Sequence, residues 1–396
     1  MKRIFFLMVM VFTGVALFAQ SGDLSGWSDA FNRAQTVAEQ LIFIRRIADG
    51  NYAESEAFYA RALDRLLLQF PNITTRSEWD AADSTALILV SKLGEAQNAE
   101  AGLNLWRVVD NFTLPTVRAE ALRALGKTGN TAFIPQIIQL LNDLNTRPQS
   151  DSEMAARFEI IASGAISALE SYKQPEGFLP VYFASTGWYT DRIRSQASAA
   201  LGNILTDPSD PMIQIIRDSG YTYAVKYLAL QTSERSQASN EDKARVAVAA
   251  LTEGWRHQVS DTSQRNQLYQ MRLLALNMIQ RYGTTDEAVY PPLDRSYRDG
   301  DMDEKLAAIQ TLSALATVDS ARLLSGYLNT IHIRRVTHIL TANDEQLVRV
   351  IIPALGNVGS VGGEQSRPIL TQVQQSSEWT NSVRNLAADA LARIGN

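Results

Sequence analysis

Cysteine is absent from this chain of 396 residues. The absence excludes disulfides, thiolate metal sites and a lipid-anchored lipoprotein, which needs a cysteine at its cleavage site. Histidine is also scarce, with only His257, His332 and His338. The last two are six positions apart, whereas a spacing of four would place two ligands on one helix face. We therefore expect no metal and no cofactor.

Sequence motifs of common catalytic sites are missing as well. No Gly-x-Ser-x-Gly elbow occurs, and the glycine-rich residues 356–363 lack the Lys-Ser/Thr pair that grips phosphates. Residues 299–303 alternate carboxylates as a calcium loop does, but Glu304 and Gln310 replace the expected glycine and bidentate glutamate. Asp303 instead suits the N-cap of a helix beginning at Glu304. We expect no catalytic residues, although paired carboxylates from distant segments stay open.

Charge gives little indication of a polyanionic partner. The net charge is −5, and acidic and basic residues are mixed along the chain. No basic stripe of the kind that neutralises phosphates is present, so we expect no nucleic-acid partner.

The N-terminus resembles a secretory signal. Lys2 and Arg3 precede the apolar or small residues 4–18, and Ala19 is followed by polar residues. The run is shorter than the roughly 20 residues of a membrane span, so we predict cleavage after Ala19 and a periplasmic or secreted protein. An uncleaved signal anchor is the alternative. No second apolar stretch of spanning length follows, so we expect no stable membrane insertion after cleavage.

One short pattern recurs four times: an apolar residue, arginine, two variable residues, alanine, two variable residues, then two small or apolar residues. It occupies residues 117–125, 193–201, 271–279 and 383–391. Residues 115–144 show the fullest repeat unit. We expect a first helix that Gly126 and Gly129 end, followed by a second helix with one apolar face. Equivalent leucines or isoleucines from Leu93 to Leu391 recur in eight steps of about 37 residues.

This pattern resembles HEAT repeats, and is closest to the bacterial variety also seen in phycobilisome lyase-like proteins. Residues 115–144 and 191–217 match best, and the resemblance extends with gaps over residues 80–396. It implies an all-α, right-handed α-solenoid of helix pairs. We expect a signal peptide at 1–19, an N-terminal helical cap at 20–78 and the HEAT-like array at 79–396. We expect the last repeat to consist of its first helix alone.

The repeat arginines have two interpretations. Arg118, Arg194, Arg272 and Arg384 form either a ligand-binding row or structural contacts to carbonyls and carboxylates of the adjacent repeat. We favour the structural role, since each repeat must be held to its neighbour.

An aromatic stretch is the main candidate for a binding site. It includes Phe178 and Phe183 together with our candidate binding residues, which are Tyr182, Trp188, Tyr189, Tyr221, Tyr223 and Tyr227. Aromatic side chains with polar ends favour binding surfaces, but they also fill cores. Tyr221, Tyr223 and Tyr227 do not share one helical face, so some must be exposed.

Three functional hypotheses follow. The first, implied by the repeat resemblance, is a non-enzymatic exported scaffold that binds protein or peptide on a curved surface. The second is an enzyme or enzyme accessory acting on cell-envelope glycan, which requires exposed aromatics beside two acidic residues in one groove. The third is a structural envelope component that self-associates through its C-terminal repeat.

Overall fold

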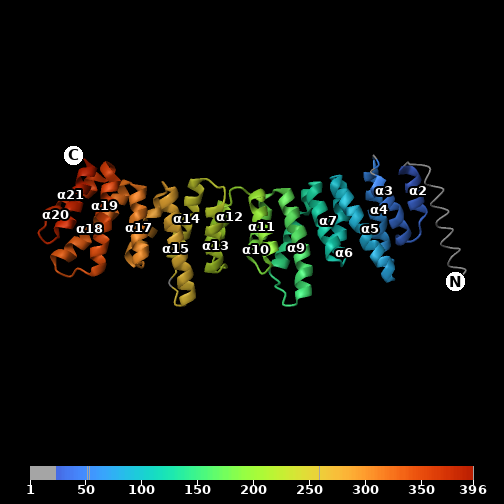
Figure 1. Cartoon of the computed structure of the whole chain (residues 1–396), viewed down its shortest axis with the longest axis horizontal. Helices are drawn as coiled ribbons and strands as arrows, with labels where there is room; N and C mark the ends of the chain where they lie inside the picture. Colours follow the sequence, from blue (N-terminus) through green and yellow to red (C-terminus); the bar gives the residue numbers. More distant parts are fainter. Residues whose placement is uncertain (1–23, 51, 53, 258, 396) are drawn as a thin grey trace. The chain divides into compact units, whose positions relative to one another are not determined.

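The computed structural model describes residues 24–395 except 51, 53 and 258. The expected signal peptide therefore lies outside the described residues. Helices dominate the described part of the chain, which contains no strand. Contacts divide the chain into two compact units, Met1–Leu205 and Thr206–Asn396. Each unit is all-α, as the sequence predicts, and its helices lie side by side (Figure 1).

In unit 1 the helices are α2 (Leu24–Arg33), α3 (Val37–Gly50), α4 (Ser55–Gln69), α5 (Arg76–Glu95), α6 (Gly102–Asn111), α7 (Pro115–Thr128), α8 (Ile134–Asn145), α9 (Ser152–Tyr172), α10 (Phe178–Thr186) and α11 (Asp191–Ile204). Helices α3, α5, α7, α9 and α11 pack in that order as one row. In a second row α4 packs on α6, and α8 on α10. The expected cap, residues 20–78, contains α2 to α4 and the start of α5.

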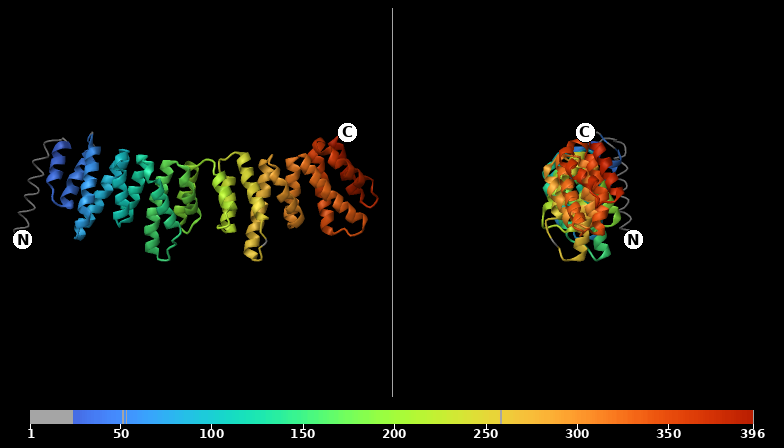
Figure 2. Two further views of the ribbon diagram at one scale, coloured as in Figure 1. Left: turned by 180° about the vertical axis from the view of Figure 1, so that it is seen from behind. Right: turned by 90° about the vertical axis from the view of Figure 1, so that its left-hand side faces the viewer.

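In unit 2 the helices are α12 (Ser209–Arg217), α13 (Tyr223–Arg235), α14 (Asn240–Gly254), α15 (Thr262–Tyr282), α16 (Tyr290–Asp299), α17 (Met302–Leu315), α18 (Val318–Val336), α19 (Ala342–Val358), α20 (Gly363–Gln375) and α21 (Asn381–Ile394). One row runs α13, α15, α17, α19, α21 and the other α12, α14, α16, α18, α20. This packing of alternate helices within each unit, seen from behind in Figure 2, is that of an α-solenoid. A right-handed sense stays a prediction.

The repeat pattern marks buried positions of one helix row. In α7, Val117, Ala121 and Leu125 are fully buried, and Pro115 lies in the first turn, where its missing N–H costs nothing. The equivalent residues Ile193, Ala197 and Leu201 of α11 are buried as well. Apolar residues three and four positions apart therefore give each helix one face that its neighbours cover.

Gly126, which we expected to help stop the first helix of its pair, lies inside that helix. Gly126 is within α7, and the helix ends at Gly129, whose φ of 69° is the left-handed conformation typical of a helix end. A Cβ on Gly126 would lie 2.7 Å from the Cα of Ala168 in α9. Gly94 and Gly356 likewise face Ala124 of α7 and Ala390 of α21. These glycines let successive helices of a row approach closely, so the stop signal belongs to Gly129 alone.

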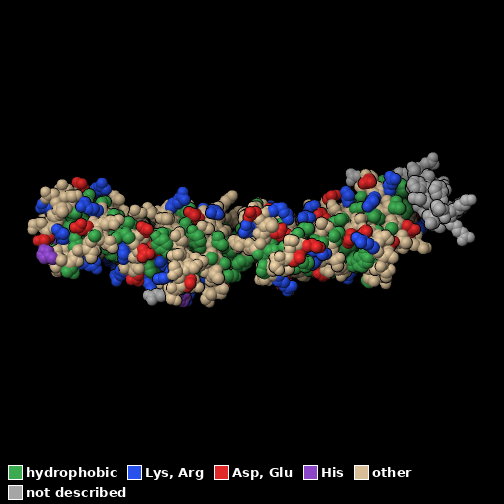
Figure 3. All heavy atoms as spheres, turned by 60° about the horizontal axis from the view of Figure 1, so that its bottom comes forward, with side chains coloured by type: hydrophobic (Ala, Val, Ile, Leu, Met, Phe, Trp, Pro, Cys, Tyr) green, Lys and Arg blue, Asp and Glu red, His purple; other side chains and the backbone are tan. Residues whose placement is uncertain are grey.

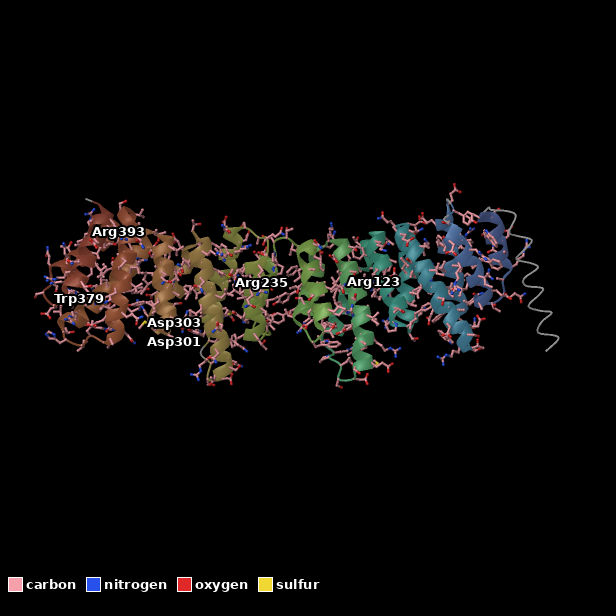
Figure 4. All side chains as sticks on the ribbon, viewed as in Figure 1. Arg123, Arg235, Asp301, Asp303, Trp379 and Arg393 are labelled. Atoms are coloured by element: carbon pink, nitrogen blue, oxygen red, sulfur yellow. The ribbon has the colours of Figure 1, made fainter. Side chains whose placement is uncertain are left out.

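The start of α17 also differs from the sequence prediction. The helix begins at Met302 with Asp301 as its N-cap residue, two positions before the expected cap at Asp303. The Glu304 carboxylate accepts a hydrogen bond from the Asp301 backbone N–H at 3.0 Å. Asp303 instead accepts a hydrogen bond from the Tyr269 hydroxyl of α15 at 3.0 Å. Figure 4 shows Asp301 and Asp303 together at this end of α17.

Two features are absent from the part of the chain that the structure describes. No helix there is both long and apolar enough to span a bilayer. Among residues 24–395, leaving aside 51, 53 and 258, no group of three or more histidine, aspartate or glutamate side chains is placed to hold a metal ion. On the face drawn in Figure 3, basic and acidic side chains are interspersed within each unit.

Candidate functional site

The six aromatic candidates divide between the two units. Tyr182, Trp188 and Tyr189 belong to unit 1, whereas Tyr221, Tyr223 and Tyr227 belong to unit 2. Each group is therefore described within its own unit.

The unit 1 tyrosines are core residues. Tyr182 is fully buried, and its ring stacks on Phe178 with the two planes within 9°. Tyr189 is only 2% exposed, and burial, with a smaller contribution from the Glu159 carboxylate, raises the pKa of its hydroxyl. A ligand has no access to either ring in this structure, because both fill the space between helices.

Trp188 is half-buried, and a hydrogen bond and a stacking contact hold its indole ring in place. Its indole N–H donates to the Leu144 carbonyl at 3.0 Å, and its ring stacks on Tyr189 with centroids 4.4 Å apart. The residue therefore anchors the α10–α11 connection to the end of α8.

In unit 2, Tyr221 and Tyr223 line a cavity of about 680 Å³, here named the tyrosine pocket. Its wall comprises the Ser219–Ala224 segment before and at the start of α13, then Lys226, Glu253, His257, Asp261, Ser263, Gln264 and Gln267. Three successive helices, α13, α14 and α15, thus contribute. Both tyrosines are half-buried, whereas His257 is exposed. Tyr227 is also half-buried but does not line the pocket.

A buried ion pair forms part of the pocket wall. Lys226 Nζ lies 2.6 Å from Glu253 Oε1, and the two side chains are 2% and 5% exposed. The ammonium is also 5.7 Å from the centre of the Tyr223 ring, a cation–π distance. Burying two charges is costly unless both are paired, so the pair holds α13 against α14 in one geometry.

The carboxylates of the pocket already have partners. Besides Lys226, Glu253 contacts Arg256 Nη1 through Oε2 at 3.5 Å. The Asp261 side chain caps α15 by accepting the Gln264 backbone N–H at 2.8 Å. Neither carboxylate is positioned as one of two free acids flanking a scissile bond. The wall instead offers tyrosine rings, hydroxyls and amides, which suit a polar ligand held by hydrogen bonds and stacking.

The four repeat arginines do not share one role. Arg118 donates to the Val109 carbonyl of α6 at 2.8 Å. Arg272 donates to Glu304 of α17 at 2.5 Å and to the Gly254 carbonyl of α14 at 3.0 Å, with its guanidinium 4.0 Å above the Trp255 ring. These two join neighbouring helices.

The other two arginines bond locally. Arg194 pairs with Asp191 and Arg384 bonds Asn381, each within one turn of its own helix. An arginine at the same repeat position therefore contacts a neighbour only where that neighbour presents a carbonyl or carboxylate.

Sequence reasoning missed Lys226, Glu253, His257 and Asp261 as pocket residues. Tyr223 and Lys226 are three positions apart, a spacing that places them on one helix face and was available from the sequence. Glu253 is 27 positions from Lys226, and only the packing of α13 against α14 reveals that they meet.

Comparison with protein families gives one match. Residues 117–143 match the model of the PBS lyase HEAT-like repeat. These residues belong to α7, the following 3-10 turn Thr131–Phe133 and α8, which form the helix pair predicted from the sequence. No curated protein matches the chain significantly.

Proposed function

The chain is a HEAT-repeat protein, and on that premise we propose that it is a non-enzymatic binding scaffold whose tyrosine pocket holds a polar segment of a partner protein. The observation that carries this proposal is the pocket itself. Two half-buried tyrosine rings and a set of hydroxyl and amide groups surround a fixed ion pair. The engagement of both carboxylates supports binding over catalysis, because a hydrolytic pair needs free acid and base groups.

Glycan binding in the same pocket is the second candidate. It is favoured by the presence of Tyr221 and Tyr223 in one cavity with two carboxylates, Glu253 and Asp261. Sugars stack on aromatic rings and bond to carboxylates and amides. The partner-protein proposal remains first, because repeat folds of this kind present surfaces for macromolecules.

Site-specific photo-crosslinking tests the proposal. A benzophenone amino acid replaces Tyr221, and Tyr227 serves as the matched control because it is a half-buried tyrosine of the same region outside the pocket. We expect a discrete protein adduct from position 221 in cells and none from position 227. Equal adducts at the two positions, or none at either, would remove the support for a pocket-bound protein.

The glycan candidate has its own measurement. Co-sedimentation of the chain with purified envelope polysaccharide is compared for the natural chain and Tyr223→Ala. Several-fold weaker retention of the variant is expected for stacking on this ring. Retention that does not change would reject glycan binding here.

Export is a separate proposal that rests on the sequence of residues 1–19. The intact mass of the protein purified from its native cells should lack these residues. A full-length mass in the membrane fraction would favour the uncleaved anchor.

A further inference from the structure

A second cavity in unit 2 has a different chemistry from the tyrosine pocket. Its volume is about 610 Å³, and four arginines line it, one each from α12, α14, the turn after α14, and α16: Arg217, Arg245, Arg256 and Arg295. Helix α14 packs on both α12 and α16, and supplies the floor. We name this cavity the arginine groove.

The floor of the arginine groove is apolar. Val248 and Ala249 follow Arg245 by three and four positions, so the three side chains lie on one face of α14. Val248 and Ala249 are each 5% exposed, yet both line the cavity. The groove therefore combines a flat apolar base with cationic walls.

One wall is rigid. Two guanidiniums contact the Trp255 ring, that of Arg272 at 4.0 Å and that of Arg295 at 5.6 Å from its centre. Its indole N–H donates to the Ser296 hydroxyl at 2.8 Å. These contacts hold Arg295 beside the groove in a defined orientation.

Most of the groove arginines form only solvent-exposed ion pairs or, within the described residues, no ion pair. Arg245 pairs with Asp210 and Asp242, and Arg295 pairs with Asp299, but in each pair both groups are at least 30% exposed. Exposed pairs of this kind contribute little and exchange readily for another carboxylate. Arg217, in the last turn of α12, forms no ion pair with any described residue.

The carboxylates in the lining are also largely occupied. Glu253 is neutralised by the buried Lys226 on the side of the tyrosine pocket. Asp286 accepts the Ala288 backbone N–H at 2.9 Å. An anion entering the groove would thus meet four guanidiniums and one lining carboxylate, Asp286, that forms no ion pair with any described residue. It would compete with Asp210 and Asp242 for Arg245, and with Asp299 for Arg295.

We propose that the arginine groove binds a short acidic peptide segment of a partner protein, with one apolar side chain on Val248 and Ala249. Guanidiniums bond carboxylates through two parallel N–H groups, which suits glutamate and aspartate side chains. This site lies outside the tyrosine pocket, and its test is independent of the proposed function.

The groove disfavours nucleic acid. Its four arginines are gathered in one cavity of about 610 Å³. The apolar floor would also contribute nothing to phosphate contacts, which require cations along an extended track.

Fluorescence anisotropy with the full mature chain tests the proposal. The probe is fluorescein-labelled Glu-Glu-Leu-Glu-Glu, and Lys-Lys-Leu-Lys-Lys is its charge-reversed control. We expect binding of the acidic probe that falls several-fold between low and high salt, and no binding of the basic probe. Arg217→Glu with Arg256→Glu should weaken binding by at least tenfold.

The matched control carries the same charge change outside the groove. Arg235→Glu with Arg265→Glu alters two exposed arginines that do not line the cavity (Arg235 is labelled in Figure 4). Binding within about twofold of the natural chain is expected here, and also for Tyr223→Ala in the tyrosine pocket. An equal loss in the control variant, or full displacement of the probe by a short oligonucleotide, would overturn the proposal.

Discussion

At the scale of single residues, the Lys226–Glu253 pair separates two cavities of opposite chemistry. Glu253 lines both of them, and its pairing with Lys226 leaves the arginine groove cationic. The same pair fixes the wall beneath Tyr223. One buried contact therefore sets the electrostatics of two candidate sites.

Lys226→Met should destabilise the protein by about 3–5 kcal/mol, because the Glu253 carboxylate would stay buried without its main partner. Urea unfolding followed by circular dichroism measures the loss. The double variant Lys226→Met with Glu253→Met should recover most of it, since no buried charge remains. A double variant as unstable as the single one would show that the charge is not the cause.

The sequence could indicate that aromatic residues are concentrated in this region, but not which of their side chains a ligand can reach. Tyr189 and Tyr223 both stand next to a helix start in aromatic surroundings. Tyr189 is only 2% exposed, whereas Tyr223 lines the tyrosine pocket between α13, α14 and α15. Accessibility depends on loops that no local pattern specifies.

At the scale of helices, the glycines within rows set how closely neighbours approach. Gly126→Ala places a Cβ 2.7 Å from the Ala168 Cα, so overpacking should cost about 1–3 kcal/mol. Gly202→Ala is the matched control, because that helical position of α11 has nothing within 4 Å. It should stabilise the protein by about 0.5–1 kcal/mol. Urea midpoints that move in the same direction would contradict this account.

The sequence predicted which segments are helical more accurately than where those helices begin and end. Apolar spacing located α7, α8 and α11, and the family match supports it for α7 and α8. The predictions for Gly126 and Asp303 were wrong because each residue type has two common roles. A glycine can end a helix or allow two helices to pack closely, as Gly126 does. An aspartate can cap a helix or bond a neighbouring side chain, as Asp303 does with Tyr269. Only the neighbouring helix decides between them.

The contact between α18 and the α20–α21 connection should weaken in acid. His332 Nδ1 accepts the Trp379 indole N–H at 3.0 Å, and burial lowers the pKa of His332 below its ordinary 6.5. The folded state favours the neutral imidazole, so this stabilisation is full above pH 6.5 and is lost as pH falls through the lower folded pKa. Figure 4 labels Trp379 at this contact.

Hydrogen exchange of residues 376–381 measures the effect, and we expect faster exchange as the pH falls below 6.5, after correction for intrinsic rates. His332→Gln should remove the pH dependence, since an amide can accept from Trp379 but does not titrate in this range. His257→Gln, at an exposed histidine, should leave it unchanged.

At the scale of the whole molecule, two units each contain their own rows of packed helices. The repeat spacing predicted a continuous array and gave no sign of a division between Leu205 and Thr206. The reason is that the repeat pattern indicates which helix faces are buried but not how extensive the contacts between consecutive repeats are. Both candidate cavities, with all their lining residues, belong to unit 2.

Residues 206–396 expressed alone should therefore fold and keep both proposed binding activities. Helix pairs in such arrays are stabilised mainly by their nearest neighbours, and the Lys226–Glu253 and Arg272–Glu304 pairs are internal to this unit. A fragment of residues 240–396 is the control, because it lacks α12 and α13 and so exposes Glu253 and the buried face of α14. Circular dichroism and the acidic-peptide assay should find the first fragment helical and competent and the second destabilised and non-binding. Equal behaviour of the two fragments would show that α12 and α13 do not complete this unit.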